Sequence, residues 1–427
     1  MTTSHRVDDP PEPLAPPAQG GAPPRVRRWP SARRVLCGLA VAFFFVPAVA
    51  AALGVRATGF ENKRLVGFPS FSDGWRFFPE LSTWAIDHLP LRNDAVRADT
   101  AISQHVFGEP PTFGENSAGL PIGNQPGASA VQVSRVVVGR DSWLFFNDDF
   151  SYACQPLASF AQTRAAADRL AGLITGTGAR YAMFVGPDKS FMEPQYLPGS
   201  FPLKNCGPPA QRAFWAELAA SPPAGYVDLR GPLLAAQARA GVPIYRLRDT
   251  HWTAVGEAVY AERLAATVDP QLLNDTTLRD VGPVSPIGDL TRLLGVPQTN
   301  TYDNWVVDRP GVAAGAVQRR LVDGLPVAEY RSSSTGAALY PAPVLIIADS
   351  YTREAILQVE PFWSDLLIVD NQTAAAHPAG LAQLIRGSRV VILEAVERSY
   401  ANGYLKLLAP SALDALARDL GPGAGGS

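Results

Sequence analysis

Residues 343–352 read PVLIIADSYT, and this stretch carries the main prediction about the fold. Its first half is a short, continuous apolar run, which is typical of a strand buried on both faces of a sheet. Comparable runs recur along the chain at Val136–Val138, Tyr181–Val185, Leu366–Val369 and Val390–Leu393. Stretches with helical character lie between several of them, at Ala161–Ile174, Thr253–Val268 and Ala379–Arg386. This order predicts an α/β fold with a mainly parallel sheet and helices on both faces.

The composition of the 427 residues excludes several classes of protein. With 47% hydrophobic and 18% charged residues, the chain can bury a large core, which rules out wholesale disorder. The net charge of −2 gives no general attraction to nucleic acid, so we expect no nucleic-acid partner. Five histidines and three cysteines are too few for zinc fingers or iron–sulfur clusters, and the sequence has no glycine-rich phosphate loop. We therefore expect neither a metal nor a cofactor.

The sequence divides into five parts, the largest of which carries the α/β pattern. We expect a disordered, proline-rich tail at 1–34, a transmembrane anchor at 35–54, a lead-in segment at 55–130, the α/β domain at 131–410 and a C-terminal tail at 411–427. Within the α/β domain, the stretch 270–342 is rich in proline, glycine and aspartate. It is expected to be an irregular insertion.

The expected anchor is the run Val35–Gly54, which contains no charged residue. Twenty helical residues span about 30 Å, the thickness of a bilayer core. Arginines crowd the sequence just before the run, which favours a cytoplasmic N-terminus and an exported body. A cleaved signal peptide, with Ala48-Val49-Ala50 as its cleavage site, and a buried core helix are the two alternatives. The expectation is a single-pass protein of the cell membrane whose body is extracytoplasmic.

Export also affects the interpretation of the cysteines. Cys37 lies within the apolar run, which leaves Cys154 and Cys206 as an even pair in an oxidising compartment. We expect these two cysteines to form a disulfide, with two separate buried thiols as the alternative.

Two short stretches carry residues that can perform nucleophilic catalysis. Asp249 and His251 lie two residues apart, so their side chains point the same way in an extended segment. Ser350 follows a buried strand at its carboxyl end, where α/β folds place their ligands. Separately, the first pair is explained as a structural contact and the serine as a helix N-cap. Together they supply a nucleophile, a base and an orienting acid.

Several motifs in this order resemble the SGNH-hydrolase-like alginate O-acetyltransferase family of the AlgX/AlgJ type. The resemblance rests on DTHW at 249–252 followed by a strand and DSY at 349–351, and it extends from about residue 60 to 400. Further blocks are ENKR at 61–64, DHLPLR at 87–92, GRDSWLF at 139–145, PDK at 187–189, YLP at 196–198, GDL at 288–290 and ER at 397–398.

The resemblance implies an SGNH-hydrolase-like domain and an O-acetyltransferase that acts on a polysaccharide or another cell-envelope glycan. Ser350 would be the nucleophile, His251 the base and Asp249 the orienting acid. The acetyl donor would be a multi-pass membrane acyltransferase, which makes that protein and the glycan the expected partners. A carbohydrate O-acetyl esterase and a non-catalytic glycan-binding assembly protein are the rival functions.

Four further residues are candidates for oxyanion or substrate contacts. Asn371 lies in Asp370-Asn371-Gln372, where relatives are expected to have an Asp-x-Arg pattern, and it is interpreted as an oxyanion donor or as a loop residue. Lys189 is expected to form a buried ion pair rather than to act in catalysis. Trp252 is expected to pack rather than to hold a ligand, and Tyr351 follows the candidate nucleophile.

Overall fold

A computed structural model describes residues 134–421 continuously, together with scattered residues between 35 and 90. The chain forms two compact units, one made of residues 1–57 and 66–91 and the other of residues 58–65 and 92–427. In the first unit, the ring of Phe68 meets Phe77 and Trp84 edge-on, with centroids 6.2 and 5.1 Å apart. His88 stacks on Trp84 and its Nδ1 donates to the Trp84 carbonyl at 2.9 Å.

The expected anchor, Val35–Gly54, falls only in part within the described residues. Among the residues that are described, none belongs to a helix that is both long enough and apolar enough to cross a bilayer.

The second unit is built on an eight-stranded mixed sheet. Its strands follow the order β4 (Tyr226–Val227), β3 (Arg180–Gly186), β12 (Val390–Val396), β10 (Val344–Ala348), β11 (Asp365–Asp370), β9 (Leu325–Ser334) and β7 (Val312–Ala314), with β8 (Gln318–Val322) also paired to β9. The first five strands are parallel. Strand β9 runs antiparallel to β11, and β7 and β8 run antiparallel to β9. The α/β fold is confirmed, with an antiparallel edge that was not predicted.

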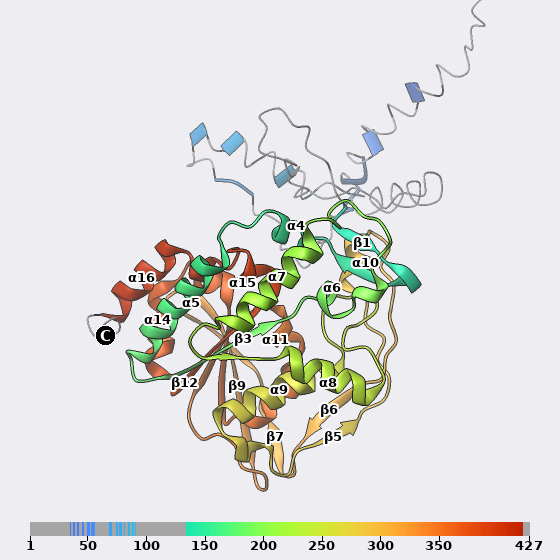
Figure 1. The fold of residues 1–427 in the computed structure, drawn as a ribbon. Coiled ribbons are helices and arrows are strands. Elements are labelled where there is room, and N and C mark those ends of the chain that lie inside the picture. The colour runs from blue at the N-terminus through green and yellow to red at the C-terminus, as the bar shows by residue number, and fades with distance from the viewer. Residues whose placement is uncertain are drawn as a thin grey trace, which may run out of the picture. The chain divides into compact units, whose positions relative to one another are not determined.

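Helices cover both faces of this sheet, as expected (Figure 1). On one face, α5 (Phe160–Thr175), α7 (Gly207–Ala220), α14 (Pro378–Gly387) and α16 (Pro410–Leu420) pack their apolar sides against Met183, Leu345 and Leu393. On the other face, α8 (Arg230–Ala240) and α9 (Ala254–Val268) pack against Phe184, Ile346 and Ile392. Alternate residues of each buried strand thus enter opposite halves of the core, which explains why these strands are apolar throughout.

Two small antiparallel sheets flank the main one. Strand β1 (Val136–Val138) pairs with β2 (Leu144–Phe146), so this apolar run does not join the main sheet. Strand β5 (Thr277–Asp280) pairs with β6 (Trp305–Asp308).

The remaining helices are short and mostly connect the larger elements. They are η3 (Arg140–Ser142), α4 (Asp148–Cys154), α6 (Lys189–Met192), η4 (Pro194–Tyr196), η5 (Pro270–Leu273), α10 (Asp289–Leu293), α11 (Ser350–Glu354), α12 (Ile356–Val359), η6 (Glu360–Phe362), α13 (Asn371–Ala374), α15 (Glu397–Ala401) and η7 (Lys406–Leu408).

Two stretches that were expected to lack regular secondary structure contain strands or a helix, so these two predictions are wrong. The stretch 270–342 contains strands β5 to β9. Strand β9 alternates buried and exposed residues over its first half, and it pairs with β11 on one side and with β7 and β8 on the other. The tail expected at 411–427 is helical as far as Leu420, because Leu413 and Leu416 of α16 are buried in the core.

The expected disulfide is present. Cys154 ends α4 and Cys206 precedes α7, and the two are bonded with their Cα atoms 5.4 Å apart. The bond ties together two helices that pack against each other although 52 residues separate the cysteines in sequence.

Candidate active site

The candidate nucleophile stands at the end of the central strand β10. Ser350 is the first residue of α11, and the helix is capped by Asp349 rather than by the serine. Oδ1 of Asp349 accepts from the N–H of Tyr351 at 2.9 Å, and its Oδ2 accepts from the N–H of Val396 at 2.8 Å. Because Asp349 supplies the cap, the hydroxyl of Ser350 is left to other contacts.

The loop that carries Asp249 and His251 is held as a tight hairpin. Tyr245 forms an antiparallel bridge with Trp252, and the N–H of Arg246 donates to the carbonyl of His251 at 3.1 Å. Buried Lys189 donates from Nζ to the carbonyls of Arg246, Leu247 and Asp249 at 2.7, 2.9 and 3.0 Å. Burial lowers the pKa of Lys189 to about 7. Within residues 134–421 Lys189 has no carboxylate partner at salt-bridge distance, so the expected ion pair is wrong and the residue holds the backbone of the loop instead.

Three side chains from these two places form a continuous chain of hydrogen bonds. Nε2 of His251 lies 2.9 Å from Oγ of Ser350, and Nδ1 lies 2.7 Å from Oδ1 of Asp249. A carboxylate can only accept, so Nδ1 carries the hydrogen and Nε2 is the acceptor for the serine hydroxyl. In this tautomer the imidazole can remove a proton from Ser350.

Asp289 is a fourth member that the sequence analysis did not assign. Its N–H donates to Oδ2 of Asp249 at 3.0 Å, and its carboxylate accepts from the N–H and the hydroxyl of Thr250 at 2.9 and 2.5 Å. Its Oδ2 also lies 3.7 Å from Nδ1 of His251. The only signal in the sequence was the GDL block at 288–290, to which no role was given.

Asp249, His251 and Asp289 offer three possible metal ligands within 4.8 Å of one another. The hydrogen bonds above already engage Nδ1 of His251 and both oxygens of Asp289. The arrangement is therefore that of a hydrogen-bonded acid–base group.

The electrostatics of the group favour a charged Asp249 and a basic His251. Burial raises the pKa of Asp249, but the hydrogen bond and charge of His251, with the charge of Arg246, outweigh burial and hold that pKa well below its usual range. Burial lowers the pKa of His251, yet the hydrogen bond and charge of Asp249 outweigh burial, and the charge of Asp289 adds to them. The pKa of His251 is therefore raised above 6.5.

Tyr351 and Trp252, the two aromatic candidates, are buried next to the triad of Ser350, His251 and Asp249. Tyr351 and Trp252 are each 1% exposed. Tyr351 donates its hydroxyl to the carbonyl of Thr250 at 2.8 Å, and Trp252 donates Nε1 to the hydroxyl of Tyr245 at 2.9 Å. The two rings meet edge-on at 4.8 Å, so both support the loop by packing.

Asn371 is buried at the end of β11, and its side-chain amide donates to the carbonyl of Glu394 at 3.2 Å. In the part of the chain that the structure describes, no hydrogen bond joins Asn371 to Ser350.

A buried acid supports the turn that presents Ser350. Oε2 of Glu394 accepts from the N–H of Asp349 at 3.2 Å and from the hydroxyl of Thr352 at 3.0 Å. Burial, and then the charge of Asp349, raise the pKa of Glu394 well above its usual range. Glu394 therefore keeps its proton to higher pH than an ordinary glutamate does.

Arg398 of the ER block at 397–398 belongs to a buried ion-pair cluster. Arg398 pairs with Asp188 at 2.6 Å and Asp149 at 3.3 Å, and its guanidinium lies 5.9 Å from the ring centroid of Tyr351. This buried ion pair backs the aromatic layer under the catalytic loop.

Residues 136–329 match the family model described as SGNH hydrolase-like domain, acetyltransferase AlgX. This part of the chain is similar to the AlgX/AlgJ family. The resemblance noted from the motifs is thereby confirmed. The matched region includes Asp249, His251 and Asp289 and ends before Ser350.

Relatives of this family match parts of the chain. Identity to the probable alginate O-acetylase AlgJ of Pseudomonas fluorescens is 29% over 133 residues, covering 31% of this chain and 33% of the relative. Identity to AlgJ of Azotobacter vinelandii is 28% over 137 residues, covering 32% and 34%. The chain thus matches about a third of the length of these relatives. The O-acetyltransferase domain of Pseudomonas putida AlgJ aligns over 65% of this chain and 99% of its own, with 21% identity and a TM-score of 0.42.

Proposed function

We propose that the protein is an O-acetyltransferase that transfers an acetyl group to a hydroxyl of a polysaccharide or other cell-envelope glycan. The observation that carries the proposal is the 2.9 Å contact between His251 Nε2 and Ser350 Oγ, with Asp249 bonded to the opposite ring nitrogen. The match of residues 136–329 to the AlgX family model, and similarity to relatives named as probable alginate O-acetylases, support transfer to a glycan.

In the first half-reaction, Oγ of Ser350 attacks the carbonyl carbon of the acetyl donor while Nε2 of His251 takes the hydroxyl proton. Asp249 stabilises the imidazolium that forms. The donor's leaving group departs with that proton, which leaves an acetyl ester on Ser350. The backbone N–H of Ser350 at the start of α11 is a donor for the oxyanion.

In the second half-reaction, a hydroxyl of the glycan attacks the acetyl ester and gives its proton to His251. Oγ of Ser350 then leaves and takes the proton back, so the enzyme is restored. With water in place of the glycan, the same steps release acetate, as in an esterase.

The location and the donor are also part of the proposal. We infer that Val35–Gly54 is a retained membrane anchor and that the body is extracytoplasmic, from the charge-free run and the arginines before it. The disulfide agrees with an oxidising compartment. Acetyl-CoA is cytoplasmic, so a multi-pass membrane acyltransferase would deliver the acetyl group.

Cell fractionation tests the location. The full-length chain is expected in the membrane fraction, and a soluble chain that starts near Ala51 would contradict a retained anchor.

Product analysis tests the reaction itself. The purified protein is mixed with an oligosaccharide acceptor and an activated acetyl ester, and the products are separated by mass spectrometry. Acetylated oligosaccharide that depends on Ser350 supports transfer. Free acetate without acetylated sugar would instead support the esterase.

A further inference from the structure

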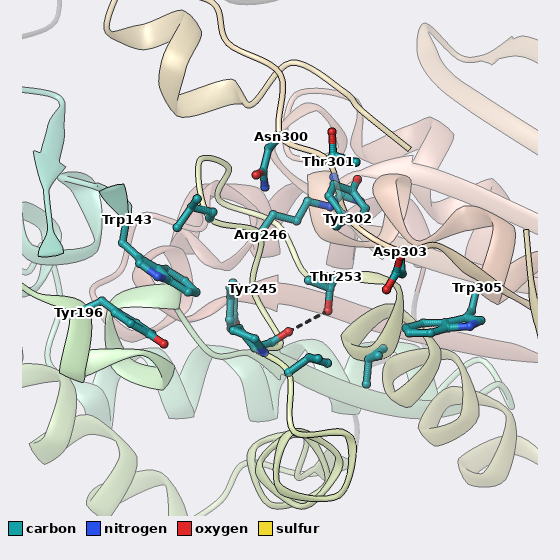
Figure 2. Close-up of a pocket in the computed structure, with 14 residues that line it drawn as sticks. Trp143, Tyr196, Tyr245, Arg246, Thr253, Asn300, Thr301, Tyr302, Asp303 and Trp305 are labelled. Carbon is teal, nitrogen blue, oxygen red and sulfur yellow. Dashed lines mark hydrogen bonds between the residues drawn. The ribbon is translucent and has the colours of Figure 1, made fainter. Parts of the chain in front are cut away.

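A separate pocket is lined in part by Tyr245 and Arg246 of the hairpin that carries His251 (Figure 2). It encloses about 430 Å³ and is bounded by Trp143, Tyr196, Arg246, Asn300, Tyr302 and Trp305, which we call the Trp305 pocket. This volume is in the range of pockets that bind small molecules. Neither Ser350 nor His251 lines it. The catalytic mechanism leaves the pocket without a role.

Aromatic rings stand on opposite sides of the Trp305 pocket (Figure 2). Trp143 and Tyr196 stack on each other with centroids 4.2 Å apart, and the half-buried Trp305 faces them across the cavity. Within residues 134–421, Trp305 is not packed against another ring. Aromatic rings combine a large apolar face with a negative quadrupole, which suits the apolar C–H face of a sugar ring.

Polar side chains complete the wall between the aromatic rings. Asn300, Thr301 and Asp303 all come from the segment before β6 and line the cavity. Asn300 and Thr301 lie at the top in Figure 2, and Asp303 lies near Trp305. An amide, a hydroxyl and a carboxylate offer both donors and acceptors, as a ligand that is rich in hydroxyl groups requires.

The charge in the pocket argues against an anionic ligand. Among the lining residues that the structure describes, Arg246 is the only cation. It is held by Glu257 at 2.6 Å and by Glu354 at 3.1 Å, and it covers the ring of Tyr302 at 5.0 Å. With Arg246 balanced by two carboxylates and Asp303 exposed nearby, a carboxylate or phosphate on the ligand would find no free positive partner.

Arg246 also connects the pocket to the triad. Its guanidinium lies 4.0 Å from Oδ1 of Asp249, and Glu354, which it binds, belongs to the same short helix as Ser350. The pocket therefore adjoins the catalytic group through one shared side chain.

We propose that the Trp305 pocket binds an uncharged sugar ring of the acceptor glycan, and that the acceptor is a neutral polysaccharide rather than a polyuronate. The role as an acceptor site rests on the proposed transferase function. The binding of a neutral sugar does not, because it follows from the lining of the pocket alone.

Calorimetry with the full chain carrying Ser350→Ala tests the inference, because this variant can bind sugar without turnover. The probes are β-1,4-linked mannopentaose and β-1,4-linked pentamannuronate. They differ only at C6 of each ring, where mannuronate has a carboxylate in place of the hydroxymethyl group. We expect mannopentaose to bind at least about 10-fold more tightly, a difference of about 1.4 kcal/mol. Trp305→Ala and Asn300→Ala, each added to Ser350→Ala, should weaken mannopentaose by a similar factor. Tyr330→Ala, in strand β9 outside the pocket, is the matched control and should bind as the parent does.

Three results would overturn the inference: equal or tighter binding of pentamannuronate, no binding of mannopentaose, or unchanged binding in both pocket variants. Melting curves show whether the Trp305→Ala variant folds. If that variant does not fold, Asn300→Ala still tests the pocket, because Asn300 lies in an irregular segment. Hydrolysis of p-nitrophenyl acetate by the wild type and by Ser350→Ala reports on the serine alone. A failure of the proposed reaction is thus seen separately from a failure of the sugar site.

Discussion

The backbone N–H of Asp289 donates to Oδ2 of Asp249 at 3.0 Å, across 40 residues of sequence. This contact occupies the carboxylate oxygen that does not face the imidazole ring and leaves Oδ1 for His251. The orienting acid is therefore fixed by α10, an element outside its own hairpin. The carboxylate of Asp289 in turn holds Thr250, the residue between Asp249 and His251. The orientation of His251 thus depends on Asp289, which bonds to both residues that precede the histidine.

The first prediction concerns the pH dependence of acetyl transfer. His251 acts as a base only when it is neutral, so activity should rise with pH through its pKa, which is raised above 6.5. Asp249→Asn removes the negative charge, and with it the charge-assisted hydrogen bond, that raise this pKa, so the midpoint of the rise should move to lower pH. Turnover should also fall, by up to about 10⁴-fold as for other triads. Asp289→Asn should shift the midpoint in the same direction by less, and an unchanged midpoint in both variants would contradict this account.

The second prediction concerns Ser350 and His251 as one unit. Replacing either with alanine should remove nearly all turnover, by about 10³-fold or more, and the double variant should be little worse than each single one. Rates with p-nitrophenyl acetate and thermal melts of all three variants provide the test. Losses that multiply in the double variant would show that the two residues act independently.

The buried strands and the long helices could be predicted from the sequence because their patterns are local. The run Val344–Ile347 lies within β10, and Thr253 precedes α9. Strand β9 was missed because the polar run Arg331–Ser334 and Pro326 obscure the inward alternation of Leu325, Val327 and Glu329. Helix α16 was missed because the glycines that follow it dominate the end of the chain. The role of Asp289 could not be predicted, since it arises from a contact between distant loops.

The third prediction concerns Glu394 under the turn that presents Ser350. Its pKa is raised in the folded state, so its contribution to stability is present at low pH and is lost as pH rises through that folded pKa. Asp349, Thr352 and Tyr260 are the groups that face it. Glu394→Gln mimics the neutral acid and cannot ionise. Denaturant unfolding at a series of pH values should therefore show the wild type losing stability relative to this variant as pH rises. A difference in stability that does not depend on pH would contradict the raised pKa of Glu394.

The fourth prediction concerns the disulfide. Closing a loop of 52 residues is worth about 4 kcal/mol through the entropy of the unfolded chain. The double variant Cys154→Ser, Cys206→Ser should therefore unfold at a clearly lower temperature than the wild type in the absence of reductant. Cys37→Ser, which changes a cysteine outside the disulfide, is the control and should melt like the wild type. Equal melting of the double variant and the wild type would show that the bond adds nothing to stability.

The central claim is that Ser350 carries the acetyl group during the reaction, and peptide mass spectrometry tests it most directly. The protein is mixed with p-nitrophenyl acetate, quenched in acid during turnover and digested. The account predicts an acetyl ester on the peptide that contains Ser350, a slower build-up of that ester in Asp249→Asn, and none in Ser350→Ala. A Ser350→Ala variant that melts like the wild type, turns over at the wild-type rate and carries its acetyl group elsewhere, or nowhere, would contradict it.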